Sequence, residues 1–433
     1  MSFSKWREAK IGDLCTIKGG KRLPKGRNLT INKTKHPYIR IRDMYQHKYI
    51  EENGELEYVD DQTFELIKRY IVDSGDIILA IVGNTIGLVS LIGKSLNKAS
   101  LTENCVKLID MKSVKPEFIY YYLITEAGQN EIKSKIVGTS QPKLPIYGVQ
   151  DIKIPVPPLK EQEEMVAILS SLDDKIKVNS QINKTLGDMA QAIFKQWFVD
   201  FEFPNEYGEP YKSSGGEMVE SELGMIPKEW DIVELSNIVS ENRRGFAPSY
   251  SKNDIGIPVI NQRCIRNHTI IEEAVKYHDN EVKKVSEDFF LKPFDVLINS
   301  MGVGTLGRVS QVSIVEQEQI VHSCITILRS NKDVVDPIIL GHMIKNLESV
   351  IEVMGTGSTG QTSLNNKDLG MLKVVLPPIS IQNEISILLT KLLITIDQNN
   401  IENKKLGQIR DLLLPKLMSG EIRVPLDEEG EVS

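Results

Sequence analysis

Cysteine is scarce in this chain, and its few cysteines are far apart. The 433 residues include four, at Cys15, Cys105, Cys264 and Cys324, and no two of them form a C-x-x-C pair. This spacing excludes the common zinc modules and a disulfide-stapled scaffold, and it is typical of a protein in a reducing cytoplasm. We therefore expect no metal site. Cys105 and Cys324 fall at matching places in the two halves of the chain, and we predict that both are small buried core residues.

Long apolar runs are missing as well. No such run reaches membrane-spanning length, and no basic-then-apolar leader follows Met1. We therefore expect a cytoplasmic protein that neither crosses a membrane nor is secreted.

Motifs for nucleotide binding and catalysis are incomplete. GVGTLG (302–307) matches G-x-G-x-x-G, but the strand-like RVSQVSIV follows it where a dinucleotide site needs a helix, so we predict a turn or hairpin. GTGSTGQT (355–362) resembles a phosphate loop, but Gln361 stands in place of the lysine. The six histidines are dispersed, and no Asn-Pro-Pro-aromatic or Asp-Pro-Pro-aromatic tetrapeptide is present to hold a base for methyl transfer. We expect neither catalytic residues nor a bound cofactor in this chain.

Positive charge is limited overall but concentrated in one segment. The formal net charge is −7, yet nine lysines and arginines and no acid occur between Lys18 and Arg42. Local basic patches matter more than net charge for phosphate binding, so this segment predicts a phosphate-binding surface. A solvated basic loop would have the same composition. The nine are Lys18, Lys21, Arg22, Lys25, Arg27, Lys33, Lys35, Arg40 and Arg42.

The chain repeats itself. At an offset of 220 residues, fifteen of the forty-seven pairs between positions 141 and 187 are identical, far more than chance gives. PVPPLKEQEEMVAIL (155–169) returns as VLPPISIQNEISILL (375–389), PYIRIR (37–42) as PVINQR (258–263), and GDIILAIVG (75–83) as FDVLINSMG (294–302). Each half thus has the same plan, in which a head is followed by a Pro-Pro element and a periodic segment.

The heads have the pattern of mixed α/β domains. Runs such as IILAIVG and VLINSMG are strand-like, and PEFIYYYLITEAGQNEI (116–132) predicts a short amphipathic helix with proline at its start. We divide the chain into a first head (1–155), a helix (156–201), a turn-rich linker (202–226), a second head (227–375), a second helix (376–420) and an acidic tail (421–433).

The two periodic segments predict an antiparallel coiled coil. Apolar residues alternate at spacings of three and four over nearly five heptads, which indicates a supercoil. Both copies carry two asparagines at the same mid-seam positions, where a buried amide fixes register. Two independent helices, each packed on its own head, are the alternative, and Arg410 interrupts the second seam without explanation. The predicted seam comprises Leu169, Leu172, Ile176, Asn179, Asn183, Leu186, Leu389, Leu392, Ile396, Asn399, Asn403 and Leu406.

Two stretches resemble a known family. PPLKEQEEMVAILSSLDDKIKVNSQINKTLGDMAQAIFKQWFVDF (157–201) resembles the central conserved region of type I restriction-modification specificity subunits, and the segment 377–422 resembles their distal conserved region. The resemblance implies an α+β fold, with two pseudo-symmetric target recognition domains joined by two long antiparallel coiled-coil helices.

The same resemblance implies a division of labour. Each head would read one half of a split double-stranded DNA target, and the helices would set the unread spacer. Two methylation subunits would dock on the helices and carry S-adenosylmethionine and the adenine chemistry. Restriction subunits, with ATP and Mg²⁺, would join them for translocation and cleavage. The chain itself would be non-catalytic.

Candidate DNA contacts follow from residue chemistry. Basic side chains bind phosphates, whereas Arg, Asn and Gln bond guanine or adenine bidentately, although an arginine in such a strand is as often an ion-pair partner. The candidates in the first head are Lys18, Lys21, Arg22, Lys25, Arg27, Arg40 and Arg42; those in the second are Arg243, Arg244, Asn261, Gln262, Arg263 and Arg266. Ser140-Gln141 and Gln361-Thr362-Ser363 are recurring polar loops that either touch backbone or only turn the chain.

Two other functions fit parts of the sequence. A coiled-coil adaptor with two protein-binding heads would have no salt-dependent affinity for DNA, and the acid-free basic segment disfavours it. A single-chain methyltransferase-nuclease would need a catalytic domain that this length and these motifs do not supply.

Overall fold

The computed structural model describes residues 6–45, 48–52, 56–271, 274–302, 304–355 and 363–424. It forms two compact units, each of which contains one head and half of each long helix. The first unit comprises Met1–Lys177 and Asn403–Ser433, and the second comprises Val178–Glu402.

The head of the first unit contains two sheets. The larger has the order β2 (Thr16–Gly19), β10 (Cys105–Ile109), β7 (Ile77–Ala80), β8 (Val89–Ile92) and β4 (Tyr49–Ile50); the smaller has the order β5 (Glu57–Tyr58), β3 (Pro37–Ile39), β9 (Ala99–Leu101) and β6 (Ile71–Val72). Strand β1 (Arg7–Lys10) pairs separately with β11 (Lys153–Val156). The helices are α1 (Ile11–Leu14), α2 (Asp61–Ile67), α3 (Pro116–Ile124), α4 (Glu126–Ser134) and α5 (Ile146–Gln150), with short 3-10 helices η1 (Ile41–Met44) and η2 (Gly83–Thr85).

The head of the second unit repeats this plan. One sheet has the order β15 (Val239–Arg244), β23 (Ile325–Ser330), β20 (Val296–Asn299) and β21 (Val309–Gln311); the other has β19 (Lys276–His278), β16 (Ile257–Ile260) and β22 (Ile320–Val321). Strand β14 (Asp231–Glu234) pairs with β24 (Lys373–Leu376), as β1 does with β11. Helices α7 (Leu235–Ile238), α8 (Pro337–Asn346), α9 (Glu348–Val353) and α10 (Asn366–Gly370), the 3-10 helix η4 (Glu287–Phe289) and the hairpin of β17 (Ile265–Arg266) and β18 (Thr269–Ile270) complete the head.

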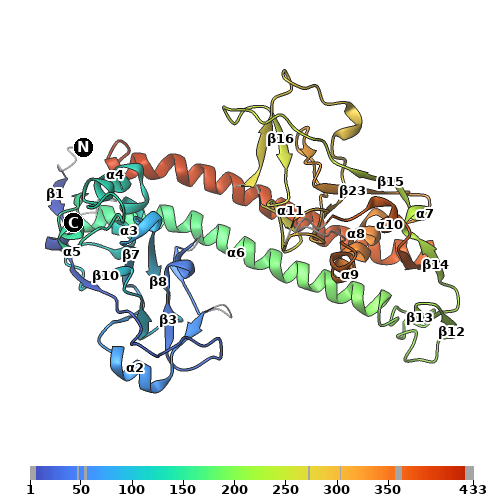
Figure 1. Ribbon diagram of the computed structural model, residues 1–433, viewed down its shortest axis with the longest axis horizontal. Helices are drawn as coiled ribbons and strands as arrows, with labels where there is room; N and C mark the ends of the chain where they lie inside the picture. The colour runs from blue at the N-terminus through green and yellow to red at the C-terminus, as the bar shows by residue number, and fades with distance from the viewer. Residues whose placement is uncertain are drawn as a thin grey trace, which may run out of the picture. The chain divides into compact units, whose positions relative to one another are not determined.

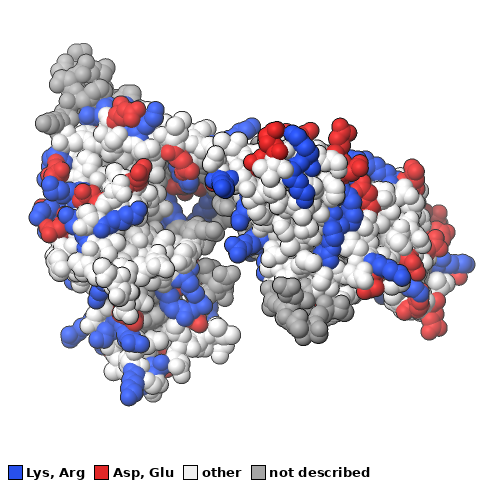
Figure 2. Space-filling model, turned by 45° about the horizontal axis from the view of Figure 1, so that its top comes forward, with Lys and Arg blue, Asp and Glu red and all other residues white. Residues whose placement is uncertain are grey.

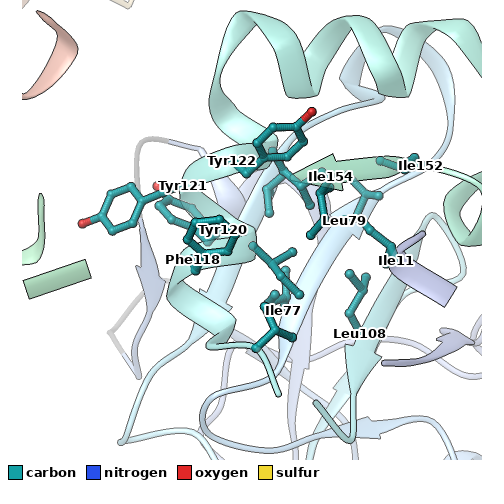
Figure 3. Close-up of a cluster of buried hydrophobic side chains, with 14 of the residues drawn as sticks. Ile11, Ile77, Leu79, Leu108, Phe118, Tyr120, Tyr121, Tyr122, Ile152 and Ile154 are labelled. Carbon is teal, nitrogen blue, oxygen red and sulfur yellow. The ribbon is translucent and has the colours of Figure 1, made fainter. Parts of the chain in front are cut away.

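The central strand of each head is buried on both faces, which explains its unbroken apolar sequence. In β7, Ile77 and Leu79 face α3 (Figure 3), whereas Ile78 and Ala80 face the core of the second sheet. In β20, Val296 and Ile298 alternate with Leu297 in the same way. The strands predicted in IILAIVG and VLINSMG are therefore confirmed. The described residues of 302–307 lie in the connection between the antiparallel strands β20 and β21, as predicted for a turn or hairpin.

The helix predicted over 116–132 is wrong in two respects. It consists of two helices, α3 and α4, because Thr125 ends the first and caps the second: its Oγ1 accepts a hydrogen bond from the Gly128 backbone N–H at 3.1 Å. In addition, α3 is not amphipathic, since all six residues from Phe118 to Leu123 are buried. The proline at its first turn is as predicted.

The predicted linker contains regular structure. Strands β12 (Met218–Ser221) and β13 (Gly224–Pro227) form an antiparallel hairpin, and Tyr211 stacks on Phe203 with ring centroids 4.6 Å apart. Of the predicted acidic tail, residues 425–433 lie outside the described residues.

Two long helices complete the units, α6 (Leu159–Phe198) and α11 (Ile379–Ser419), the green and red helices of Figure 1. In each unit their segments run antiparallel. In the first unit Glu161 contacts Arg423 and Asp173 contacts Arg410. In the second unit Asn179 contacts Glu402 and Asn183 contacts Asn399. Within each unit the partner's number thus falls as the α6 number rises. The antiparallel pairing predicted from the heptads is thus observed within both units.

Helix α11 requires a correction to the predicted absence of apolar runs. Among the described residues it is the one helix long and apolar enough to cross a membrane, judged by length and composition only. Within the second unit, Ile385 and Leu389 of this helix are buried in the core, whereas Ile387 and Leu388 are exposed.

The cysteines are all free thiols. Cys105 is fully buried, as predicted, whereas the prediction for Cys324 is wrong, because this residue, directly before β23, is only partly buried. Burial raises the pKa of both thiols.

Candidate nucleic-acid interface

The basic segment of the first head runs from β2 through a long loop to β3 and η1. Seven of its nine cations are exposed, and only Arg27 and Arg40 are partly buried. Within the described part of the chain, Lys18, Lys21, Lys25 and Lys35 have no carboxylate within ion-pair distance. Lys33 is paired with Glu52 at 2.8 Å. The segment therefore presents a group of lysines whose charge is available to a polyanion.

A hollow of about 410 Å³ opens among these residues. Four cations line it, namely Arg22, Lys25, Arg27 and Arg40, together with Tyr38 and the carboxylate of Glu103. Arg22 lies 3.6 Å from Glu103 but is 85% exposed, so this pair is weak in water. Arg27 also lies 3.8 Å from Asp60, and Arg40 pairs with Glu57, so Arg22 and Lys25 are the cations of the hollow most available to an anionic oxygen.

Arg40 and Arg42 are less available than the sequence suggests. Both guanidinium groups pair with Glu57, Arg42 at 3.3 Å, and Arg42 also lies 3.5 Å from Asp43. Burial raises the pKa of Asp43, and its Oδ2 accepts a hydrogen bond from the Arg40 backbone N–H at 2.7 Å. Their proposed contact with bases stays a prediction, and it would require these ion pairs to open.

Arg243 and Arg244 of the second head contact their own protein. The Nε of Arg243 lies 2.7 Å from Glu241, and its guanidinium lies 4.9 Å from the Phe289 ring centre. Arg244 donates to the Ser363 hydroxyl at 3.2 Å and to the Leu364 carbonyl. Burial lowers the pKa of Arg244. These contacts are within the head, and they position β15.

The remaining candidate DNA contacts lie in and near the loop after β16, and they differ in whether their side chains are bonded within the head. Asn261 uses both side-chain atoms locally, because it donates to the Ala274 carbonyl at 2.6 Å and accepts from the Arg263 backbone N–H at 2.9 Å. Arg263 and Arg266 are exposed and, among the described residues, have no carboxylate within ion-pair distance. The Gln262 side chain lies beside Gly302, and none of its atoms has a hydrogen-bond partner in the described structure. Gln262, Arg263 and Arg266 are the groups in this loop that a ligand meets first.

Two further lysines of the second head, Lys276 and Lys283, were not among the predicted site residues. Lys276 lies 4.9 Å from the ring centre of Tyr250, and Lys283 lies 4.2 Å from that of Phe246. Tyr250 in turn stacks on His322, whose pKa is lowered by burial and by Lys276. No spacing pattern in the sequence indicates these pairs, because the two partners of each pair lie far apart along the chain. On the face shown in Figure 2, lysine and arginine side chains alternate with acids over both units.

The predicted seam residues of both long helices lie on partly or fully buried positions. Leu169, Asn179 and Leu389 are fully buried, and the other nine are partly buried. Asn183 donates to the Asn400 side-chain carbonyl at 2.8 Å and to the Ile396 backbone carbonyl at 3.2 Å, and it accepts from Asn399 at 2.8 Å. Asn179 donates to the Glu402 carboxylate at 2.7 Å. Such directional contacts fix the register of the pair.

Arg410, which had no explanation in the sequence, belongs to a polar cluster of the first unit. Its Nη1 lies 3.0 Å from the Asp173 carboxylate, which also accepts from the Tyr121 hydroxyl at 2.5 Å. Lys48 donates to Tyr121 at 2.6 Å and to Ser170 at 2.9 Å. Burial lowers the pKa of Lys48 and raises that of Tyr121. The cluster joins α6, α11 and the first head.

A family model matches the chain twice, once in each half. The model describes the type I restriction modification DNA specificity domain, and the matched residues are 4–214 and 227–409. The chain belongs to the type I restriction-modification specificity family. Each match covers one head together with most or all of the long helix that follows it.

Proteins named as specificity subunits match this chain over different lengths. A putative type I restriction enzyme MjaX specificity subunit of Methanocaldococcus jannaschii is 25% identical over 364 residues, which is 82% of this chain and 80% of that protein. The HindI specificity subunit of Haemophilus influenzae is 27% identical over 208 residues, or 46% of this chain and 42% of that one. The fold is similar to the crystal structure of a type I restriction-modification S subunit from M. genitalium, with TM-score 0.57, 17% identity, and coverage of 95% and 96%.

The specificity-family scaffold contains a repeated tie that the sequence analysis missed. Gln162 is fully buried; its side chain accepts from the Lys115 backbone N–H at 3.0 Å and donates to the Pro157 carbonyl at 2.9 Å. Gln382 accepts from Asp336 at 2.8 Å and donates to Pro377 at 2.9 Å. The glutamine repeated five residues after each Pro-Pro start was the available signal. Each tie fastens the first turn of a long helix to its head.

The remaining predictions concern the polar loop at 361–363 and the absence of a metal site. Gln361 and Thr362 lie outside the described residues, and Ser363 accepts the hydrogen bond from Arg244. Over the described ranges, no three His, Cys, Asp or Glu side chains are grouped to hold a metal ion.

Proposed function

We propose that this chain is the DNA-reading subunit of a type I restriction-modification complex, in which each head reads one half of a bipartite target. The observation that carries the proposal is the double match of the family model, one match per half, on a chain whose halves repeat the same order of strands and helices. A repeated scaffold with different loops suits two half-sites of different sequence.

The charged groups support different roles in the two heads. In the first head, the exposed cations Lys18, Lys21, Arg22 and Lys25 supply phosphate contacts, which position the protein without reading sequence. In the second head, Gln262 and Arg263 supply base contacts, since an amide pairs bidentately with adenine and a guanidinium with guanine. Lys276 and Lys283 add phosphate contacts there.

The long helices set the unread spacer and dock two methylation subunits. A helix of 40 residues is about 60 Å long, enough to span more than one turn of duplex. The methylation subunits carry S-adenosylmethionine and transfer methyl groups to adenine, and restriction subunits with ATP and Mg²⁺ complete the complex. The chain itself supplies recognition and no catalytic residue, and it acts in the cytoplasm.

Selection from random DNA tests the proposal. The chain, assembled with its methylation subunits, is incubated with duplexes that contain a randomised segment, and bound DNA is sequenced. Two conserved blocks separated by a fixed number of unspecified base pairs are expected. An adaptor with protein-binding heads would enrich no sequence, and that result would refute the proposal.

A further inference from the structure

The two units contain the same tryptophan-centred site with different chemistry. In the first unit the Arg423 guanidinium lies 5.2 Å from the Trp6 ring centre and its Nη2 lies 2.9 Å from the Glu161 carboxylate, which also accepts from Trp6 Nε1 at 3.1 Å. In the second unit Phe203 stacks on Trp230, also at 5.2 Å, and Ile381 packs against the same apolar cluster.

These residues occupy equivalent positions in the repeat. Glu161 and Ile381 are 220 residues apart, as are Phe203 and Arg423, and each tryptophan directly precedes the first strand of its head. The first unit therefore pairs a carboxylate with a guanidinium, whereas the equivalent residues of the second unit are two apolar side chains of one core cluster. Glu161 is only 2% exposed, so its charge depends on that partner.

A second set of equivalent positions, on the two long helices, differs between the units in the same way; we call each such set a layer. Asp173 pairs with Arg410 at 3.0 Å in the first unit, and the residues 220 positions away from them are Leu393 and Ala190. Ala190 and Leu393 are both buried in the core of the second unit. Two layers of the helix pair are thus ionic in one unit and apolar in the other.

We propose that these two layers make each half of the chain pair with the other half and reject a second copy of itself. In a pair of two first halves, Glu161 would meet Phe203 of the other copy and Asp173 would meet Ala190. In a pair of two second halves, Arg423 would meet Ile381 and Arg410 would meet Leu393. Both like pairs place a charge against an apolar group, whereas the unlike pair matches charge with charge and apolar with apolar. The effect is greatest at the buried Glu161. It is smaller in the second layer, where Asp173 keeps Lys48 at 3.5 Å and Arg410 keeps Asp411 at 2.8 Å from their own halves.

The asparagine contacts add to this rule. Asn179 and Asn183 have identical counterparts in Asn399 and Asn403, but their partners Glu402 and Asn400 correspond to Ile182 and Ser180 in the first half. A pair of two first halves would therefore also lose the hydrogen bond from Asn179 to Glu402. If the two heads read different half-sites, the rule makes the target asymmetric, a consequence that depends on the proposed function; the pairing rule itself does not.

Partner exchange in the full chain tests the rule. A protease site is inserted in the exposed turn at Tyr207, which is 79% exposed, and the purified chain is cut so that its halves stay associated. The halves are released in urea, diluted and counted as like or unlike pairs by native mass spectrometry. We expect the ratio of unlike to like pairs to be at least about tenfold higher than the ratio that random pairing gives. A random ratio in the wild-type chain overturns the proposal.

A symmetrised variant identifies the cause. Glu161→Ile with Arg423→Phe copies the apolar site of the second unit into the first, and the preference for unlike pairs is expected to fall toward random. Glu161→Gln is the second variant, since it keeps the shape and the acceptor for Trp6 but removes the charge, and it should weaken the preference in the same direction. Gln181→Met, at an exposed position of α6, is the matched control and should exchange as the wild type does. An unchanged preference in both Glu161 variants overturns the proposal.

Discussion

At the scale of single residues, two neighbouring amide side chains in the loop after β16 differ in their hydrogen bonds. Asn261 bonds to its own backbone, whereas the Gln262 amide has no hydrogen-bond partner among the described residues. A free amide beside an exposed arginine is the arrangement that base reading requires, and a bonded amide is the arrangement that shapes a loop.

Replacement of Gln262 should relax the target at one base pair. Gln262→Ala is expected to remove about 1–3 kcal/mol of discrimination at one position of the second half-site, while thermal unfolding stays unchanged. Asn261→Ala is the matched comparison, and it should lower the free energy of unfolding by about 0.5–1.5 kcal/mol because it removes the hydrogen bonds to the Ala274 carbonyl and the Arg263 backbone N–H. Selection from random duplexes measures the base preference, and an unchanged preference in Gln262→Ala would exclude this residue as a reader.

His342 gives the protein a predicted loss of stability in mild acid. Burial and the charge of Lys345 lower the pKa of this imidazole to about 3, and its ring stacks on Phe194. Between pH 6.5 and pH 3 the unfolded chain binds a proton here that the folded chain does not, so stability falls as pH falls, by about 1.4 kcal/mol per unit.

The variant His342→Phe removes that proton and keeps the stacked ring. Urea unfolding at pH 6.5 and pH 5 should show the wild type losing about 2 kcal/mol more than the variant over this interval. Equal losses in the two proteins would show that His342 is protonated in the folded chain.

Residue chemistry predicted the candidate site only in part. The sequence identifies cations, but it does not reveal that Arg40 and Arg42 pair with Glu57 or that Arg244 bonds to Leu364. These partners are distant along the chain, so only the folded sheets bring them together. The same reason explains why Lys276 and Lys283 were missed.

At the scale of elements, the Pro-Pro starts of α6 and α11 depend on the buried glutamine that follows each of them. Gln162 and Gln382 accept the backbone N–H that precedes α3 and α8, respectively. The long helix of each half is therefore fixed to its head at one point, as well as through apolar packing.

Loss of either glutamine amide should destabilise the junction. Gln162→Met preserves the volume but leaves the Lys115 N–H unpaired, and the free energy of unfolding is expected to fall by about 1–3 kcal/mol. Gln382→Met should have the same effect, and Gln181→Met, at an exposed position of α6, should have none. Urea denaturation of the three variants measures the effect; equal stability of Gln162→Met and the control would contradict the role of the tie.

Elements were more predictable than contacts. Continuous β-branched apolar runs identified the central strands, and the heptad pattern identified both long helices. In each case the apolar positions follow directly from which faces of the element are buried. The break between α3 and α4 was not predictable from that spacing. Thr125 caps α4 at this point, but the apolar spacing of the sequence shows no break there.

At the scale of the whole molecule, the proposed account makes helix length a determinant of the target. Seven residues inserted into each long helix, after Lys177 and before Asn403, preserve the heptad phase and add about 10 Å. The unread spacer is expected to lengthen by about three base pairs, with both half-sites unchanged. Altered half-sites in the selected DNA would show that the heads do not read independently.

The duplication was visible in the sequence, but the difference between its copies required the structure. Glu161 and Arg423 are 262 residues apart, and their pairing across Trp6 has no sequence signature. The sequence similarity between the two halves thus reflects their shared scaffold, and the residues that distinguish the halves are at positions where the two sequences differ.

The most direct test of the proposed function is a map of methylated adenines in cells that contain this chain and its methylation subunits. The account predicts one asymmetric bipartite motif, with two different half-sites and a fixed gap of unread bases. A map with no motif that depends on this chain, or with one uninterrupted motif, would contradict it.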